Sequence, residues 1–271
     1  MEFVEAKGVR IPAVGLGTMM LRDEACVSIV GKAIELGYRN IDTAQLYGNE
    51  REVGEGIRAS GVKREDIFLT TKVTWNRLPE FEKAVDDSLT ALKVPWVDLL
   101  LIHWLGHDLT VTETVKRLCA FRRRGLAKNV GVANFTIAML DEAVQAADEP
   151  LVNHQIEVHP FLDQTKVIAA TRKHGLSITA YCPNARGNVF GNPVLERIGM
   201  AHGKNVAQVA LRWVAQQGMI PIPRTSSPAH LADNLNIFDF TLSDSEMTEI
   251  AALTRPDGRV IDPPHAPKWD V

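Results

Sequence analysis

The chain has 271 residues, of which 45% are hydrophobic and 23% charged, and its formal net charge is −3. This length and apolar content are enough for a sizeable core, and α/β barrels of this size commonly form one domain, so we expect a single domain over residues 1–271. The nearly balanced charge gives no electrostatic footprint for nucleic acid or an anionic membrane, and no apolar run approaches the roughly 18 residues that span a bilayer.

The chain start and the cysteines indicate the compartment. The first residues include Glu2, Glu5 and Lys7, which makes this segment too charged for a secretory signal. The cysteines are odd in number, widely spaced and without a metal-ligand pattern. They are Cys26, Cys119 and Cys182. We therefore expect a reduced, cytoplasmic protein.

Strand-like and helix-like segments alternate along the chain after an N-terminal hairpin. Residues 3–12 form two short extended pieces around Lys7-Gly8, which predicts a hairpin. Strand-like segments follow at residues 14–16, 40–42, 67–71, 97–102, 129–132, 152–155, 177–180 and 219–222. The segment 97–102 is nearly all apolar, as expected of a parallel strand that is buried on both faces.

Amphipathic helical patterns lie between these strands. Apolar residues recur at three-and-four spacing over residues 81–92, 137–147 and 206–214. Thr136, Asp163 and Ser243 are expected helix caps, and Glu246 completes a capping box with Ser243. The uninterrupted alternation predicts an α/β fold, a single (β/α)8 TIM barrel with an N-terminal β-hairpin closing the bottom. On periodicity alone, an open doubly wound sheet is the alternative.

Four side chains that can carry proton chemistry follow successive predicted strands. Asp42 ends the second strand, Tyr47 lies in the loop after it, Lys72 ends the third and His103 the fourth. Reactive groups of a barrel sit at these strand ends, and neighbouring strands are about 4.8 Å apart, so we expect these side chains to meet. An ammonium beside Tyr47 would make it a better proton donor, and Asp42 could hold that ammonium. The alternative is a structural Asp42–Lys72 ion pair beside ordinary polar residues.

Several motifs resemble those of the aldo-keto reductases, in particular bacterial diketogluconate-reductase-like members. They are residues 37–44 with 47–50, 101–104, 131–135, 153–160 and 222–225, in the family's order and spacing. The resemblance runs from about residue 8 to residue 257. It implies a barrel that reduces aldehydes or ketones to alcohols, with hydride from NADP(H) and a proton from Tyr47. Lys72 and Asp42 would then tune Tyr47, and His103 would orient the carbonyl.

The resemblance also implies which residues hold the cofactor. They are Gly17, Thr18, Asp42, Ala133, Asn134, Gln155, Tyr181, Cys182, Arg224, Thr225, His230, Asp233 and Asn234. Ala133, where the family usually has serine, would face the nicotinamide amide together with Asn134 and Gln155, and Tyr181 would stack on the ring. Arg224 stands where lysine is usual, and its planar fork suits a 2′-phosphate, which predicts a preference for NADPH.

The substrate pocket is expected to be mainly apolar, which suits a small aldehyde or ketone. Its expected lining is Met19, Tyr47, Trp75, His103 and Trp104. The segments 105–110 and 182–192 are short and would leave this pocket open. The resemblance further implies a monomer whose partner is a small-molecule carbonyl substrate, with no nucleic acid and no membrane.

Other interpretations of these motifs carry less support. Residues 15–20 lack the third glycine of a dinucleotide fingerprint. His154, Glu157 and His159 could suggest a metal, but an extended segment sends the two histidines to opposite faces, so we expect no metal site. Cys182 could be a reactive thiol or an inert packed one. A redox-sensing, cofactor-binding module and a hydrolase or isomerase remain the competing functions, because fold does not fix function.

Overall fold

The computed structural model describes residues 1–106 and 109–270. Two antiparallel strands come first, β1 (Phe3–Ala6) and β2 (Val9–Pro12). An eight-stranded parallel sheet follows, in which each strand pairs with its neighbour along the chain. Its strands are β3 (Leu16–Gly17), β4 (Asn40–Asp42), β5 (Phe68–Val73), β6 (Val97–Ile102), β7 (Ala127–Ala133), β8 (Leu151–Glu157), β9 (Ser177–Tyr181) and β10 (Ile220–Pro221).

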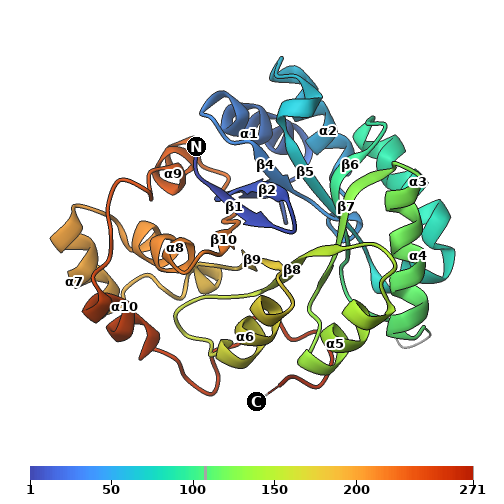
Figure 1. The fold of residues 1–271 in the computed structure, drawn as a ribbon. Helices are drawn as coiled ribbons and strands as arrows, with labels where there is room; N and C mark the ends of the chain where they lie inside the picture. Colours follow the sequence, from blue (N-terminus) through green and yellow to red (C-terminus); the bar gives the residue numbers. More distant parts are fainter. Residues whose placement is uncertain (107–108, 271) are drawn as a thin grey trace.

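Helices surround this sheet, as Figure 1 shows. They are α1 (Asp23–Glu35), α2 (Glu50–Ala59), α3 (Phe81–Leu92), α4 (Val111–Arg123), α5 (Ile137–Ala146), α6 (Thr165–Lys173), α7 (Pro193–His202), α8 (Val206–Gln216), α9 (Pro228–Leu235) and α10 (Asp244–Ala251). Short 3-10 turns lie at η1 (Gln45–Tyr47), η2 (Arg64–Asp66), η3 (Trp75–Glu80) and η4 (Ala185–Gly187). Within the described ranges, none of the helices has the length and apolar character that crossing a membrane requires.

The sheet closes on itself between its first and last strands. The Gly15 N–H donates to the Pro221 carbonyl at 3.0 Å, and the Gly17 N–H donates to the Pro223 carbonyl at 3.1 Å. Only glycine fits at position 17, because a Cβ there would lie 2.8 Å from the Ile222 carbonyl oxygen. The predicted (β/α)8 barrel is thus confirmed, and the open doubly wound alternative is wrong, because that fold leaves two free sheet edges.

The N-terminal hairpin covers the end of the barrel at which the strands begin. Lys7 and Gly8 both have positive φ, 48° and 79°, as a two-residue hairpin turn requires. The Asn40 side-chain amide, at the start of β4, donates to the Pro12 carbonyl at 3.3 Å. The hairpin therefore closes the bottom of the barrel, as predicted, and leaves the opposite end free.

The core lies on both faces of the sheet. Leu100 and Ile102 of β6 face outward into the large cluster that packs the helices against the barrel. Leu99 and Leu101 face inward, into a smaller cluster that includes Ala133 and also contacts the hairpin. Burial on both faces explains why β6 is apolar except for Asp98.

Two of the three expected helix caps are confirmed. The Thr136 hydroxyl accepts the Met139 N–H at the start of α5, and Ser243 forms the predicted capping box with Glu246. The third prediction, Asp163, is wrong by one position, because the N-cap residue of α6 is Gln164. The Asp163 carboxylate still accepts the Thr165 N–H at 2.9 Å, so it satisfies a free donor of the first turn.

Candidate active site

A cavity of about 1000 Å³ opens at the C-terminal ends of the barrel strands. It collects most of the residues that the sequence assigned separately to proton transfer, cofactor and substrate. These are Gly17, Met19, Asp42, Tyr47, His103, Trp104, Asn134, Gln155, Tyr181, Cys182, Arg224, Thr225, His230, Asp233 and Asn234. The barrel brings them together because Gly17, Asp42 and Tyr181 each end a parallel strand on this side.

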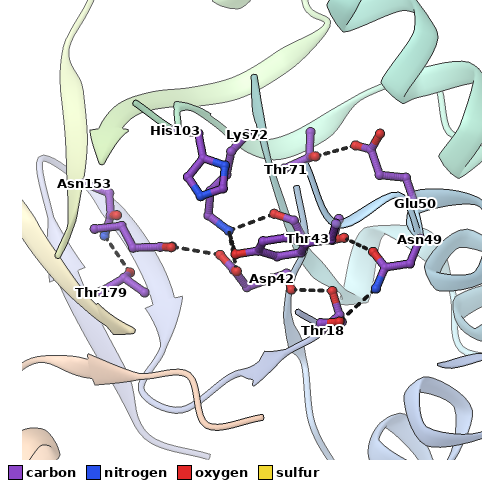
Figure 2. A network of polar contacts seen from close by, with 12 residues as sticks. Thr18, Asp42, Thr43, Asn49, Glu50, Thr71, Lys72, His103, Asn153 and Thr179 are labelled. Atoms are coloured by element: carbon purple, nitrogen blue, oxygen red, sulfur yellow. Dashed lines mark hydrogen bonds and ion pairs between the residues drawn. The ribbon is translucent and has the colours of Figure 1, made fainter. Parts of the chain in front are cut away.

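Lys72 of β5 is fully buried directly behind the cavity wall. Its ammonium donates to Asp42 Oδ1 at 2.5 Å, to the Thr43 carbonyl at 2.8 Å and to the Tyr47 hydroxyl at 3.3 Å. Figure 2 shows Lys72 reaching Asp42 and Thr43 from the neighbouring strand. An ammonium has three N–H groups, and these three acceptors account for all of them. The expected meeting of Asp42, Lys72 and Tyr47 is thus present.

The charges around Tyr47 act on its acidity in opposite directions. Burial raises the pKa of Tyr47 above its usual value, and the Lys72 ammonium only partly offsets this. Burial also has the largest single effect on Lys72 and lowers its pKa, but Asp42 and Tyr47 together outweigh burial, so that the pKa of Lys72 ends above its usual value. Tyr47 is therefore protonated and Lys72 charged at neutral pH. Lys72 acts in the expected direction, towards a lower pKa of Tyr47, but burial has the larger effect and the pKa ends above its usual value.

His103 follows β6 and lies edge-on to Tyr47, with the two ring centroids 5.8 Å apart. Burial lowers the pKa of His103 well below its usual value, and the charge on Lys72 and the neighbouring His265 act in the same direction. His103 is therefore uncharged at neutral pH. Its Nδ1 atom is buried and has no hydrogen-bond partner among the residues that the structure describes.

Buried polar residues fix the chain that carries Asp42 and Tyr47. Both the Thr18 hydroxyl and the Thr18 N–H donate to the Asp42 carbonyl, each at 3.0 Å. The Asn49 side-chain amide donates to the Thr18 carbonyl at 2.8 Å and accepts from the Thr43 hydroxyl at 3.0 Å. Figure 2 shows this chain of contacts below Asp42. Thr18 is fully buried and absent from the cavity wall, so in this structure it supports Asp42, and its contact with the cofactor stays a prediction.

Two side-chain amides and a tyrosine form the middle of the cavity. The Gln155 amide donates to Asp42 Oδ2 at 2.8 Å. The Asn134 amide donates to the His103 carbonyl at 3.0 Å and accepts from the Tyr181 hydroxyl at 2.6 Å. These contacts connect the cavity floor to the Asp42–Lys72 pair, so that each predicted amide-binding residue is held in one orientation.

The far end of the cavity is rich in donors. Arg224 is exposed, and its guanidinium makes a long contact with the Met20 carbonyl, at 3.5 Å. The Thr225 hydroxyl accepts the Ser227 N–H at 3.0 Å, just before α9 begins. A helix N-terminus beside an arginine favours an anion. His230, Asp233 and Asn234 line the same end, as the sequence predicted.

Two further predicted site residues, Ala133 and Trp75, are absent from the cavity wall, and their contacts with cofactor and substrate stay predictions. Ala133 is fully buried and packs in the inner cluster with Leu99, Leu101 and Val152, so its side chain does not face the cavity. Trp75 is absent from the wall as well. Its ring lies 5.0 Å from the ring of His265, which does line the cavity and separates Trp75 from it.

The C-terminal segment supplies a part of the wall that the sequence did not predict. Ile261, Pro263 and His265 line the cavity beside Trp104. This segment is proline-rich and has no hydrophobic period, so no pattern pointed to it. The expectation that short segments leave the pocket open overlooked this wall. Of those segments, residues 107 and 108 lie outside the described residues, while residues 182–184, 186–187 and Phe190 contribute to the lining.

Cys182 lines the cavity next to Tyr181. Burial raises the pKa of its thiol to about 11, the negative charge of Glu157 adds to the effect, and Arg186 opposes it. Because the thiolate is the reactive form of cysteine, a pKa this high favours the packed, inert interpretation. Cys26, Cys119 and Cys182 are all free thiols.

The two histidines that raised the question of a metal have separate partners. His154 Nδ1 lies 2.8 Å from the Thr171 hydroxyl, and its Nε2 accepts the Phe135 N–H. His159 Nε2 lies 2.9 Å from Glu157 Oε1. The structure therefore brings His159 and Glu157 together and separates His154 from them.

Comparison with known proteins places these features in context. The profile of the Aldo/keto reductase family matches residues 13–255. The methylglyoxal reductase DkgB of Escherichia coli O157:H7 is 38% identical over 96% of this chain and 99% of its own. A crystal structure of a protein proposed to be a 2,5-diketo-D-gluconic acid reductase B is 43% identical, with a TM-score of 0.97 over 100% of this chain and 98% of that one. An aldo-keto reductase of Bombyx mori, solved in complex with NADP, is 31% identical, with a TM-score of 0.89 over 96% of this chain and 95% of that one.

Proposed function

The chain belongs to the aldo/keto reductase family, a family of oxidoreductases, and from this premise we propose that it reduces small aldehydes and ketones to alcohols with NADPH. Tyr47 donates the proton to the carbonyl oxygen. The observation that carries this proposal is the Lys72 ammonium, buried and bonded to Asp42, the Thr43 carbonyl and the Tyr47 hydroxyl at the edge of the cavity. When the proton leaves Tyr47, this fixed ammonium stabilises the phenolate that remains.

His103 orients the carbonyl oxygen toward Tyr47. Its ring is neutral, and its Nδ1 atom is buried without a partner among the described residues. An orphan N–H is rarer in protein interiors than an orphan acceptor, so the ring proton belongs on Nε2. Nε2–H can then donate to a carbonyl oxygen that also contacts Tyr47, whose ring centroid is 5.8 Å from that of His103. The two donors converge on one oxygen, as charge developing there requires.

The cavity fits a nicotinamide dinucleotide along its length. Gly17 leaves room at its floor, and Asn184 lines it with a buried side-chain oxygen that has no partner among the described residues. Tyr181 offers a half-buried ring that is held by Asn134. Arg224, Thr225 and the N-terminus of α9 suit a phosphate at the other end. When bound, NADPH supplies the hydride for the carbonyl carbon.

Arg224 is expected to select NADPH over NADH. Arg224→Ala should raise KM for NADPH about 10- to 100-fold, since charged hydrogen bonds of this kind contribute roughly 1.5–3 kcal/mol. KM for NADH should change less than about twofold, because NADH lacks the phosphate. Steady-state kinetics with both cofactors measures the difference, and Arg197→Ala, which removes an exposed partner of Glu249 on the far helices, is the control. Equal kcat/KM for the two cofactors in the unaltered enzyme would contradict the assignment.

The substrate end of the cavity favours small carbonyl compounds. Met19, Leu46 and Trp104 make it mainly apolar, with Tyr47 and His103 as the polar groups. Methylglyoxal, the substrate named for the Escherichia coli relative, is small enough to fit this lining, so it heads the test panel. The panel continues with glyoxal, a diketone and a keto-sugar, and NADPH oxidation is followed by absorbance. No oxidation with any of them, with NADPH binding retained, would favour a redox-sensing binding module instead.

A further inference from the structure

Glu157 is the last residue of β8 and its carboxylate is fully buried, yet it takes no part in the proposed chemistry. Its Oε1 accepts the Val260 N–H at 2.6 Å and its Oε2 accepts the Ile261 N–H at 3.0 Å. His159 Nε2 lies 2.9 Å from Oε1. Both carboxylate oxygens therefore bind the backbone of one segment far along the chain. Because both carboxylate oxygens of Glu157 already accept backbone N–H groups, we interpret Glu157 as a backbone anchor and not as a metal ligand.

The segment that Glu157 binds is the C-terminal tail, residues 259–270. The side chains of Ile261, Pro263 and His265, at and just beyond the two bonded N–H groups, form the wall of the cavity at the Trp104 end. The tail reaches this place along a tight path, since a Cβ on Gly258 would lie 1.8 Å from the Phe161 carbonyl oxygen. The position of the wall is thus set by where the backbone crosses the end of β8.

Other contacts hold the tail farther out. The Trp269 ring lies 6.0 Å from the Trp104 ring, and the Arg259 guanidinium lies 3.8 Å from the Trp269 centroid. Asp270 accepts the Ile137 N–H at 2.8 Å, at the start of α5. Glu157 fixes the inner end and Asp270 the outer end, so the wall residues between them are held at two points.

We infer that Glu157 is a positioning residue for the substrate pocket, which acts by holding the C-terminal tail against the barrel through the N–H groups of Val260 and Ile261. The inference rests on the proposed function in one respect, that the carbonyl compound binds at the Tyr47 end. Glu157 touches neither that compound nor the cofactor, and it acts through the tail alone. Hydrogen bonds to a buried carboxylate are the strong kind, so their loss should release the tail measurably.

The anchor is tested first by proteolysis of the full-length protein. Glu157→Gln keeps the shape of the side chain but turns one acceptor into an N–H donor that faces a backbone N–H. Trypsin cleaves after arginine, and Arg259 directly precedes the anchored N–H groups. Cleavage of the Arg259–Val260 bond, followed by mass spectrometry, should become about 10-fold faster, since protease access tracks the open population and a charged hydrogen bond is lost. Glu249→Gln, which removes an exposed carboxylate away from the tail, should leave this rate unchanged.

A second variant approaches the anchor from the tail and leaves β8 intact. Ile261→Pro removes the N–H that Glu157 Oε2 accepts and leaves the Arg259–Val260 bond cleavable, so it should also speed cleavage after Arg259, even if Glu157→Gln fails to fold. In steady-state kinetics Glu157→Gln should raise KM for methylglyoxal about 3- to 10-fold with NADPH affinity unchanged within about twofold, as expected when only substrate binding is lost.

The possible outcomes separate this inference from the proposed function. Unchanged cleavage after Arg259 in both variants overturns the anchor. A raised KM without faster cleavage also overturns it, because the effect would then pass through Tyr181 and Cys182, which neighbour Glu157. If the unaltered protein oxidises no NADPH with any carbonyl, the proposed function fails, while faster cleavage in the variants still supports the anchor.

Discussion

Replacing Tyr47 with phenylalanine is expected to lower kcat about 100- to 10,000-fold, the range for loss of a general acid. The ring remains, so the cavity keeps its shape, and only the hydroxyl that lies 3.3 Å from the Lys72 ammonium is removed. NADPH binding should persist, because Asn134, Gln155 and Arg224 bond to His103, Asp42 and Met20 and not to that hydroxyl. Single-turnover kinetics with methylglyoxal and a fluorescence titration with NADPH measure the two effects separately.

Tyr38 provides a matched control for this substitution. Its hydroxyl is buried away from the cavity wall and donates to the Leu231 carbonyl of α9 at 3.0 Å. Tyr38→Phe should therefore cost about 1 kcal/mol of folding stability and leave kcat within about twofold. A Tyr47→Phe enzyme that keeps full activity would refute the role of Tyr47, and an equal loss in both variants would point to a nonspecific effect of deleting a hydroxyl.

Replacing Lys72 with methionine is expected to affect stability and turnover together. Lys72 is fully buried and Asp42 nearly so, and the substitution leaves the Asp42 carboxylate buried without its ion-pair partner. Breaking a buried pair from one side costs about 3–5 kcal/mol, which corresponds to a Tm lower by roughly 6–15 °C in a protein of this size. The phenolate of Tyr47 also loses its stabilising charge, so kcat should fall at least about 100-fold. Calorimetry and steady-state kinetics measure the two changes.

The double variant Lys72→Met with Asp42→Asn separates the two effects. It removes both charges, so most of the lost stability should return, because a neutral amide at position 42 can still accept from Gln155. Activity should not return, since Tyr47 still lacks its ammonium. If Lys72→Met proves as stable and as active as the unaltered protein, the buried ion pair has neither of the roles assigned to it.

The architecture was predictable because the barrel repeats a simple pattern. β4 and β6 match the predicted segments residue for residue, and in β6 burial on both faces leaves little freedom in composition. β3 does not match, and only Leu16 and Gly17 pair with β4, because Gly15 is already at the point where the sheet closes on β10. Strand ends are set by such tertiary contacts, which no local pattern records.

The proton-transfer residues were predictable for the same reason, and the wall opposite them was not. Asp42, Tyr47, Lys72 and His103 follow consecutive strands, so the topology alone brings them together. Trp75 and Ala133 were expected on the cavity wall, but the first lies behind His265 and the second faces the barrel interior. Both positions depend on contacts between segments far apart in sequence, as does the net shift of the Tyr47 pKa, in which burial outweighs the charge of Lys72.

Where the barrel closes between β3 and β10, the hydrogen bonds beside Pro223 run in one direction: N–H groups of Gly15 and Gly17 donate to the carbonyls of Pro221 and Pro223. A regular parallel ladder would return a bond from the N–H of residue 223 to the Gly15 carbonyl, and proline has no N–H to give. Gly17, Ile222 and Pro223 also line the cavity, so a dinucleotide bound there would lie across this join and hold its two edges together. Ligands that bind only the folded state stabilise it. Without its cofactor the barrel would open most readily between β3 and β10. The bound coenzyme would therefore also stabilise the closed form of the barrel that binds it.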